Sequence, residues 1–157
     1  MNLVDPSSLA VLGGAIALGG GLLGSSIGIA TAASAGAATL SEDRGQFRNV
    51  IVLASLPMTQ SFYGLIVMII ILNTVIPKLP ATGGAGFAVL GIGLMTAAAE
   101  CFSAIHQGNV CASGISLLPK TKGQIFTNAV MLAVFVELIG VLGLVFSIMA
   151  LNLHGLM

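Results

Sequence analysis

Residues 129–143 read AVMLAVFVELIGVLG, a run in which Glu137 is the only charged side chain. The apolar stretch around this run covers about residues 124–153, which is longer than the about 20 residues that a helix needs to cross a bilayer. A carboxylate near the centre of a spanning helix costs a few kcal/mol to bury and usually marks a functional position. The stretch therefore predicts a transmembrane helix with a functional carboxylate. The alternative is a protonated acid that only joins helices by hydrogen bonds.

The composition of the whole chain extends this interpretation. Of the 157 residues, 57% are hydrophobic and 6% are charged, whereas a soluble domain has about 25% charged residues. The charges cluster and leave four apolar stretches, at about 8–40, 48–76, 86–118 and 124–153. We therefore expect an all-α membrane protein of four transmembrane helices, arranged as two hairpins over residues 1–80 and 81–157. The net charge is zero, and the chain has no basic patch of the kind that binds nucleic acids.

The basic residues predict an orientation in the cell membrane. Arg44, Arg48, Lys120 and Lys122 lie in or beside loops 41–47 and 119–123, and only Lys78 lies in the gap between the hairpins. Because positive residues favour the cytoplasmic side, both of these loops should be cytoplasmic and both termini should lie on the opposite side. The first residues lack the positively charged start of a signal peptide, so we expect the first span to remain in the mature protein.

The two halves resemble each other. A shift of 78 residues places Ser25 on Ser103, Gly36 on Gly114 and Gly45-Gln46 on Gly123-Gln124, and a shift of 79 places Gly64-Leu65 on Gly143-Leu144. The nearly constant offset predicts a duplication. Each unit contains two spans, so the two copies have the same orientation, unlike the inverted repeats of many transporters.

The repeat also shows where the halves differ. Met58 occupies the position in the first half that Glu137 holds in the second, and Ile29 matches Gln107. One half lacks the carboxylate, so we expect one ion site in each chain.

Small residues recur every four positions in the first span, at Gly20, Gly24, Gly28, Ala32 and Gly36. On a helix this spacing makes one face with almost no side chains, which another backbone can approach closely. The face either packs within the chain or lines the tight inner side of a ring of many copies. Its length favours the ring.

Polar side chains at membrane depth could surround Glu137. Thr59, Gln60 and Tyr63 lie close together on the second span, and Gln107 lies on the third. Uncharged oxygens around one carboxylate suit a hard monovalent cation, whereas softer metals favour thiolate or imidazole ligands. In the alternative, these groups only form hydrogen bonds with one another across helices.

Glu100 is a second acid within a predicted span. It lies seven residues before Gln107 and therefore on nearly the same helix face. It could be an ion-access residue, an accessory partner of the site, or a protonated acid bonded to a neighbouring helix.

These motifs together resemble one family closely. Residues 56–60 (LPMTQ), Tyr63-Gly64, Gln107-Gly108 and Glu137 are similar to the motifs of the duplicated four-helix rotor proteolipid of V-type ATPases, called subunit K in bacterial sodium-pumping enzymes. The resemblance implies a Na⁺ site made by the backbone carbonyl of Leu56 and the side chains of Thr59, Gln60, Gln107 and Glu137. It also implies that Tyr63 steadies the carboxylate. Proton-binding relatives generally lack the Thr-Gln pair, so the resemblance favours Na⁺ over H⁺.

The resemblance also implies partners and a mode of action. Identical copies form a ring in lipid, a stator membrane subunit supplies half-channels, and central-stalk subunits contact the cytoplasmic loops. The chain has no phosphate-binding Gly-Lys-Ser/Thr loop, so ATP chemistry is expected in other subunits and this chain is not itself an enzyme. Ring size and the direction of coupling stay open. Two rival hypotheses are a stand-alone exchanger that uses Glu137 and Glu100 as a relay, and a membrane protein that only oligomerises.

Overall fold

The computed structural model describes residues 5–157, and these contain helices and no strands. Four helical segments are long and apolar enough to cross a membrane: Pro6–Glu42, Arg44–Lys78, Ala85–Thr121 and Phe126–Leu153. The predicted all-α class and its four spans are confirmed. The second segment begins four residues earlier than predicted.

The first, third and fourth segments are the single helices α1 (Pro6–Glu42), α4 (Ala85–Thr121) and α5 (Phe126–Leu153). The second segment contains, in order, η1 (Arg44–Gln46), α2 (Phe47–Ser55), η2 (Leu56–Met58), α3 (Thr59–Ile70), η3 (Ile71–Val75) and η4 (Ile76–Lys78). Of these, η3 is a π-helical turn and the other η elements are 3₁₀ turns. The second span is therefore the least regular of the four.

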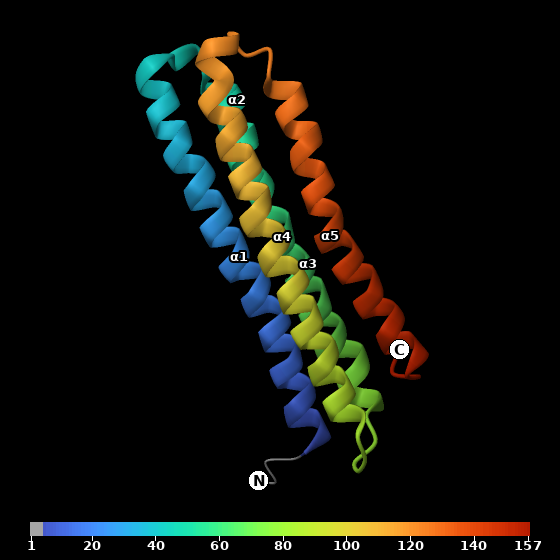
Figure 1. The fold of residues 1–157 in the computed structure, drawn as a ribbon. Coiled ribbons are helices and arrows are strands. Elements are labelled where there is room, and N and C mark those ends of the chain that lie inside the picture. The colour runs from blue at the N-terminus through green and yellow to red at the C-terminus, as the bar shows by residue number, and fades with distance from the viewer. Residues whose placement is uncertain (1–4) are drawn as a thin grey trace.

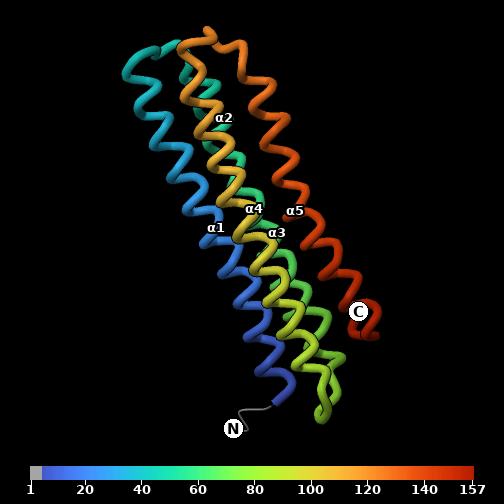
Figure 2. The backbone as a smooth tube through the Cα atoms, in the orientation of Figure 1, coloured from blue at the N-terminus to red at the C-terminus, as the bar shows by residue number. Residues whose placement is uncertain are grey.

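The helices lie side by side in two antiparallel hairpins (Figure 1). The tube view shows the turns at 43–46 and 122–125 at one end, with the turn at 79–84, the start of α1 and the end of α5 at the other (Figure 2). Contacts join α1 to α4, α4 to α5, and α1 to α3. Which end faces the cytoplasm, and the division at residue 80, remain predictions.

The end of α4 differs from the sequence-based expectation. We predicted a loop over residues 119–123, but the helix includes Pro119 and continues to Thr121. Pro119 cannot donate an N–H to the carbonyl of Ile115, four residues earlier, and the hydroxyl of Thr39 donates to that carbonyl instead, at 3.0 Å. A side chain from α1 therefore satisfies the group that the proline leaves free, which allows the helix to continue.

The turn from α4 to α5 is left-handed. Lys122 has φ 51° and Gly123 has φ 83°, and the amide of Gly123 donates to the carbonyl of Leu118 at 3.0 Å. Such left-handed termini satisfy the last carbonyls of a helix and favour glycine. The turn is thus compact and closes the second hairpin directly.

Glycines of α1 face α4 of the same chain. A Cβ added to Gly20 would lie 2.5 Å from the Cα of Ala97, and one added to Gly24 would lie 2.6 Å from the Cα of Cys101. Gly28 lies against Ala104 and Gly108 in the same way. These glycines therefore pack against the third span of the same chain, which is one of the two alternatives; the other, that the face lines the inner side of a ring, remains a prediction. Because the chain contains two hairpins, the close approach of neighbouring hairpins lies inside one chain.

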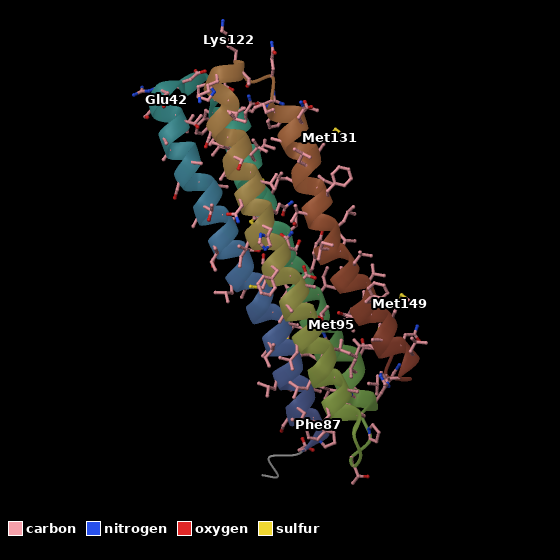
Figure 3. All side chains as sticks on the ribbon, viewed as in Figure 1. Glu42, Phe87, Met95, Lys122, Met131 and Met149 are labelled. Carbon is pink, nitrogen blue, oxygen red and sulfur yellow. The ribbon has the colours of Figure 1, made fainter. Side chains whose placement is uncertain are left out.

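Large apolar side chains cover the outside of the bundle. Phe135 is 64% exposed and Met131 is 59% exposed, and Figure 3 shows Met131 and Met149 pointing outward from α5. The charged residues Glu42 and Lys122 lie at the end of the bundle. An apolar belt with charges at the end is the surface that a bilayer requires.

Replacing Gly24 by Ala should destabilise the protein by about 1–3 kcal/mol, the usual cost of overpacking, because the new Cβ meets the α4 backbone. The matched control is Gly19→Ala on the same helix, where an added Cβ meets nothing within 4 Å. Thermal unfolding of both variants in one detergent measures the difference. Equal melting temperatures would contradict the assigned packing.

Candidate functional site

A break in the second span brings a backbone carbonyl close to two side-chain oxygens. Pro57 has no N–H, and the chain around it forms the 3₁₀ turn η2 between α2 and α3. At the end of this turn, the hydroxyl of Thr59 lies 3.3 Å from the carbonyl oxygen of Leu56 and 3.1 Å from Oε1 of Gln60. The break thus gathers three uncharged oxygens on one turn.

Glu137 receives hydrogen bonds from two other spans. The hydroxyl of Tyr63 donates to its Oε1 at 3.0 Å, and Nε2 of Gln107 donates to its Oε2 at 3.2 Å. Glu137 itself is half-buried, between the exposed side chains of α5 and the helix bundle. The carboxylate is therefore fixed by α3 and α4 at the edge of the chain.

Amide groups connect the two parts of the site. Nε2 of Gln60 donates to Oε1 of Gln107 at 2.9 Å, and Nε2 of Gln107 also donates to the carbonyl of Ala133 at 3.3 Å. Both glutamine side chains are fully buried. The oxygens beside η2 are thereby linked through two amides to Glu137.

The structure brings together all six residues of the predicted site: Leu56, Thr59, Gln60, Tyr63, Gln107 and Glu137. The set offers one carboxylate with hydroxyl, amide and carbonyl oxygens. Amide oxygens have two lone pairs, so Oε1 of Gln60 and Oε1 of Gln107 can each accept a further partner. Such a set is suited to a hard cation without thiolate ligands.

Sequence reasoning missed Ser103. Its hydroxyl accepts a hydrogen bond from Nε2 of Gln60 at 3.0 Å and donates to the carbonyl of Val136, also at 3.0 Å. Ser103 lies four residues before Gln107 and so on the same helix face, and it matches Ser25 in the repeat, but neither observation pointed to the ion site. Serine is common in transmembrane helices, so this spacing alone did not distinguish it.

Glu100 is fully buried, and neither carboxyl oxygen has a hydrogen-bond partner among residues 5–157. Its side chain fills space that glycines of α5 leave open: a Cβ on Gly140 would lie 2.7 Å from Oε2, and one on Gly143 would lie 3.2 Å from Oε1. One of the three expected roles was a hydrogen bond from Glu100 to a neighbouring helix. Residues 5–157 contain no partner for such a bond. Glu100 is enclosed within the chain, whereas Glu137 reaches its edge.

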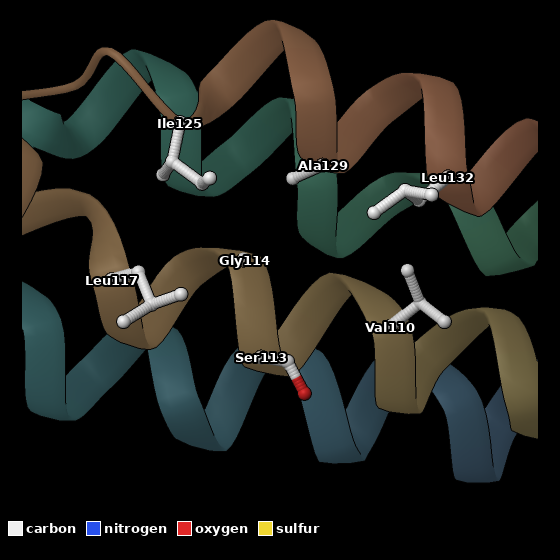
Figure 4. A pocket seen from close by; sticks show the side chains of 7 residues that line it. All are labelled: Val110, Ser113, Gly114, Leu117, Ile125, Ala129 and Leu132. Carbon is white, nitrogen blue, oxygen red and sulfur yellow. The ribbon is translucent and has the colours of Figure 1, made fainter.

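A separate groove lies between α4 and α5, nearer the turn that joins them. It has a volume of about 270 Å³ and is lined by Val110, Ser113, Gly114, Leu117, Ile125, Ala129 and Leu132. Figure 4 shows mainly apolar side chains facing it. The groove contains none of the predicted ion-site residues.

Fold and site together define a class: a four-helix membrane proteolipid with a hydrogen-bonded carboxylate in its last span. Comparison with known proteins places it more closely. The chain belongs to the ATP synthase C-subunit family, whose profile matches residues 12–71 and 90–150. The two matches begin 78 residues apart and end 79 apart, which confirms the predicted duplication.

Two relatives have known names. The chain is similar to A-type ATP synthase subunit K of Methanocaldococcus jannaschii, with 34% identity over 95% of this chain and 64% of the relative. It is also similar to V-type sodium ATPase subunit K of Enterococcus hirae, with 33% identity over 80% of this chain and 78% of the relative. The chain thus spans just under two thirds of the archaeal relative. These matches confirm the resemblance to the V- and A-type rotor proteolipids.

Replacing the buried Glu100 by Leu should leave the melting temperature unchanged or raise it. An apolar group of similar size removes a buried carboxyl that has no hydrogen-bond partner among the described residues. The matched control is Gln60→Leu at an equally buried position, which should destabilise the protein by about 1–3 kcal/mol because it strips Ser103 and Gln107 of a partner. Thermal unfolding in detergent compares the two variants. An equal loss in both would show that Glu100 has a stabilising partner.

Proposed function

We propose that this chain is the rotor-ring subunit of a rotary V/A-type ATPase and carries Na⁺ across the membrane by reversible binding at Glu137. The observation that carries the proposal is the environment of Glu137, a lone half-buried carboxylate held by Tyr63 and Gln107. Membership of the ATP synthase C-subunit family and the two subunit K relatives support the rotor role.

The position of Glu137 suits loading from outside the chain. Its neighbours on α5, Phe135 and Leu138, are exposed, so the carboxylate lies beside a surface that another membrane protein can reach. A stator subunit with half-channels would deliver the ion there. Glu100 is enclosed in the single chain and has no such route, so we assign it no carried ion and propose that it is a neutral packing group.

Ion binding changes the charge that the ring must carry through lipid. A carboxylate anion without a cation is costly to expose to hydrocarbon; with a bound cation the site is neutral and can turn past lipid. The cation would take its other ligands from the oxygens of Leu56, Thr59, Gln60 and Gln107. After release, the hydrogen bonds from Tyr63 and Gln107 hold the carboxylate in place for the next ion.

The remaining assignments follow from the same role. Identical copies form the ring, central-stalk subunits contact the turns at 43–46 and 122–125, and these turns face the cytoplasm of a cell-membrane protein. ATP is hydrolysed or made in other subunits, so this chain is not catalytic.

Na⁺ is the favoured ion and H⁺ is the alternative. The bacterial relative is named as a sodium ATPase subunit, whereas the name of the archaeal relative specifies no ion. The oxygens around Thr59 and Gln60 favour Na⁺, because a proton needs only the carboxylate.

Na⁺ should protect Glu137 from a carboxyl-directed carbodiimide at millimolar concentrations, because the bound ion occupies the carboxylate. K⁺ at equal ionic strength is the control and should give no protection. Labelling of membranes across a range of pH, followed by mass spectrometry of the peptide around Glu137, measures the effect. Identical labelling at all Na⁺ concentrations would leave H⁺ as the carried ion.

Glu137→Gln should abolish ion transport by the assembled enzyme while the ring still forms, because an uncharged amide cannot bind and release a cation as a carboxylate does. Transport is measured in vesicles that contain the whole complex, and ring assembly is measured by native mass spectrometry. Vesicles with the purified chain alone are the control and should show no flux. Flux from the chain alone would favour the exchanger, and unchanged transport by the variant would favour a purely structural role.

A further inference from the structure

We propose that Ser103 is a positioning residue that sets the orientation of the Gln60 amide, and through it the number of oxygens that the site offers to a cation. The proposal rests on the cation site proposed above. Ser103 itself need not touch the ion. It acts by fixing which atom of the Gln60 amide, the oxygen or the nitrogen, faces Thr59 and the carbonyl of Leu56.

The hydroxyl of Ser103 has one hydrogen, and this hydrogen is already used in a hydrogen bond. It goes to the carbonyl of Val136 at 3.0 Å. A hydroxyl with its hydrogen in use can present only lone pairs to other neighbours. Ser103 therefore has only an acceptor left for Gln60, which lies 3.0 Å away.

This requirement fixes Gln60. The nitrogen of its amide must point toward Ser103, and it also donates to Oε1 of Gln107 at 2.9 Å. Oε1 of Gln60 then faces the opposite way, where it lies 3.1 Å from the hydroxyl of Thr59. That hydroxyl also lies 3.3 Å from the carbonyl oxygen of Leu56. The orientation thus adds a third oxygen to the two beside η2.

The opposite orientation of the amide would remove that oxygen. It would turn the Gln60 nitrogen toward Thr59 and place its oxygen against two acceptors, Oγ of Ser103 and Oε1 of Gln107. A buried acceptor that faces another acceptor costs about 1–3 kcal/mol. Gln107 cannot reverse its own amide, because its nitrogen donates to Glu137 and to the carbonyl of Ala133. Without Ser103, Oε1 of Gln107 would be the one acceptor left to oppose the turn of the Gln60 amide. Ser103 therefore supplies one of the two acceptors that orient the Gln60 amide, and its loss halves the penalty against the reversed orientation.

The repeat supplies a matched control. Ser25 on α1 is the counterpart of Ser103 in the first half. Its side chain is also buried, at 4% exposed, yet its hydroxyl has no hydrogen-bond partner among residues 5–157. Ser25→Ala therefore removes the same atoms as Ser103→Ala but breaks no hydrogen bond to an ion-site residue.

The test uses the whole enzyme in membranes and measures the Na⁺ concentration that half-protects Glu137 from carbodiimide labelling. Ser103→Ala should raise this concentration about tenfold, the effect of losing one hydrogen bond to a buried amide. Ser103→Thr, which keeps the hydroxyl, should restore it to within about threefold of the parent, and Ser25→Ala should leave it unchanged.

A double-mutant cycle separates positioning from simple packing. If Ser103 acts through Gln60, then Ser103→Ala should have no further effect in a chain that already carries Gln60→Ala. The competing route is the bond to Val136, which ties α4 to α5 beside Glu137. If Ser103→Ala lowers Na⁺ affinity equally in the parent and in the Gln60→Ala chain, the effect comes from the hydrogen bond to Val136, and the proposal is overturned.

Other outcomes are equally decisive. If Na⁺ protects the parent and Ser103→Ala equally well, the role of Ser103 is wrong and the Na⁺ site stands. If Na⁺ does not protect the parent, the Na⁺ proposal fails and takes this inference with it. Native mass spectrometry checks that rings form; if Ser103→Ala does not assemble, Ser103→Cys replaces it, because a thiol keeps the volume but is a weak hydrogen-bond partner.

Discussion

The structure depends on one constraint: a carboxylate that reaches the lipid-facing edge of a membrane bundle must find its partners inside the protein, because hydrocarbon offers none. Glu137 finds them on α3 and α4, through Tyr63 and Gln107. Each partner needs support in turn, and Gln107 receives it from Gln60. The polar groups therefore form a connected layer that crosses three helices.

This layer divides the apolar interior in two. One buried cluster includes Val67, Ile71, Val89 and Leu151, and the other includes Leu53, Ile115, Leu118 and Ala133. The two clusters hold the helices together on either side of the site. Helix packing in a membrane relies on close contact and small residues, and the glycines of α1 supply that contact with α4. The backbone around the site can thus be rigid even though the second span is interrupted at Pro57.

The sequence predicted the spans well because a bilayer demands long apolar runs, and it predicted Glu137 because an acid inside such a run is costly. The spacing of Tyr63 and Gln60 on one helix made them possible partners of Glu137, and the family resemblance implied their roles. The sequence did not predict the helix that faces Gly24, because periodicity identifies a face and not its partner. Pro119 was placed outside the helix for a similar reason: the hydroxyl of Thr39 that compensates for it comes from a distant part of the chain. Ser103 was missed because its importance depends on a carbonyl of α5.

Duplication explains how the site could become asymmetric at little cost. In the first half, Met58 stands where the second half has Glu137, and Met58 is 44% exposed. An apolar side chain on the outer face needs no partners in lipid, so the first half needs no hydrogen-bonded layer around this position. The difference between the halves extends to Ser25, the counterpart of Ser103: its hydroxyl is buried without a partner among the described residues, whereas Ser103 joins Gln60 to α5. If the proposed rotor role holds, one site per four helices means fewer ions for a ring of given circumference. Since each charge moved across 100 mV corresponds to about 2.3 kcal/mol, fewer ions per turn would let the same ATP energy work against a larger membrane potential.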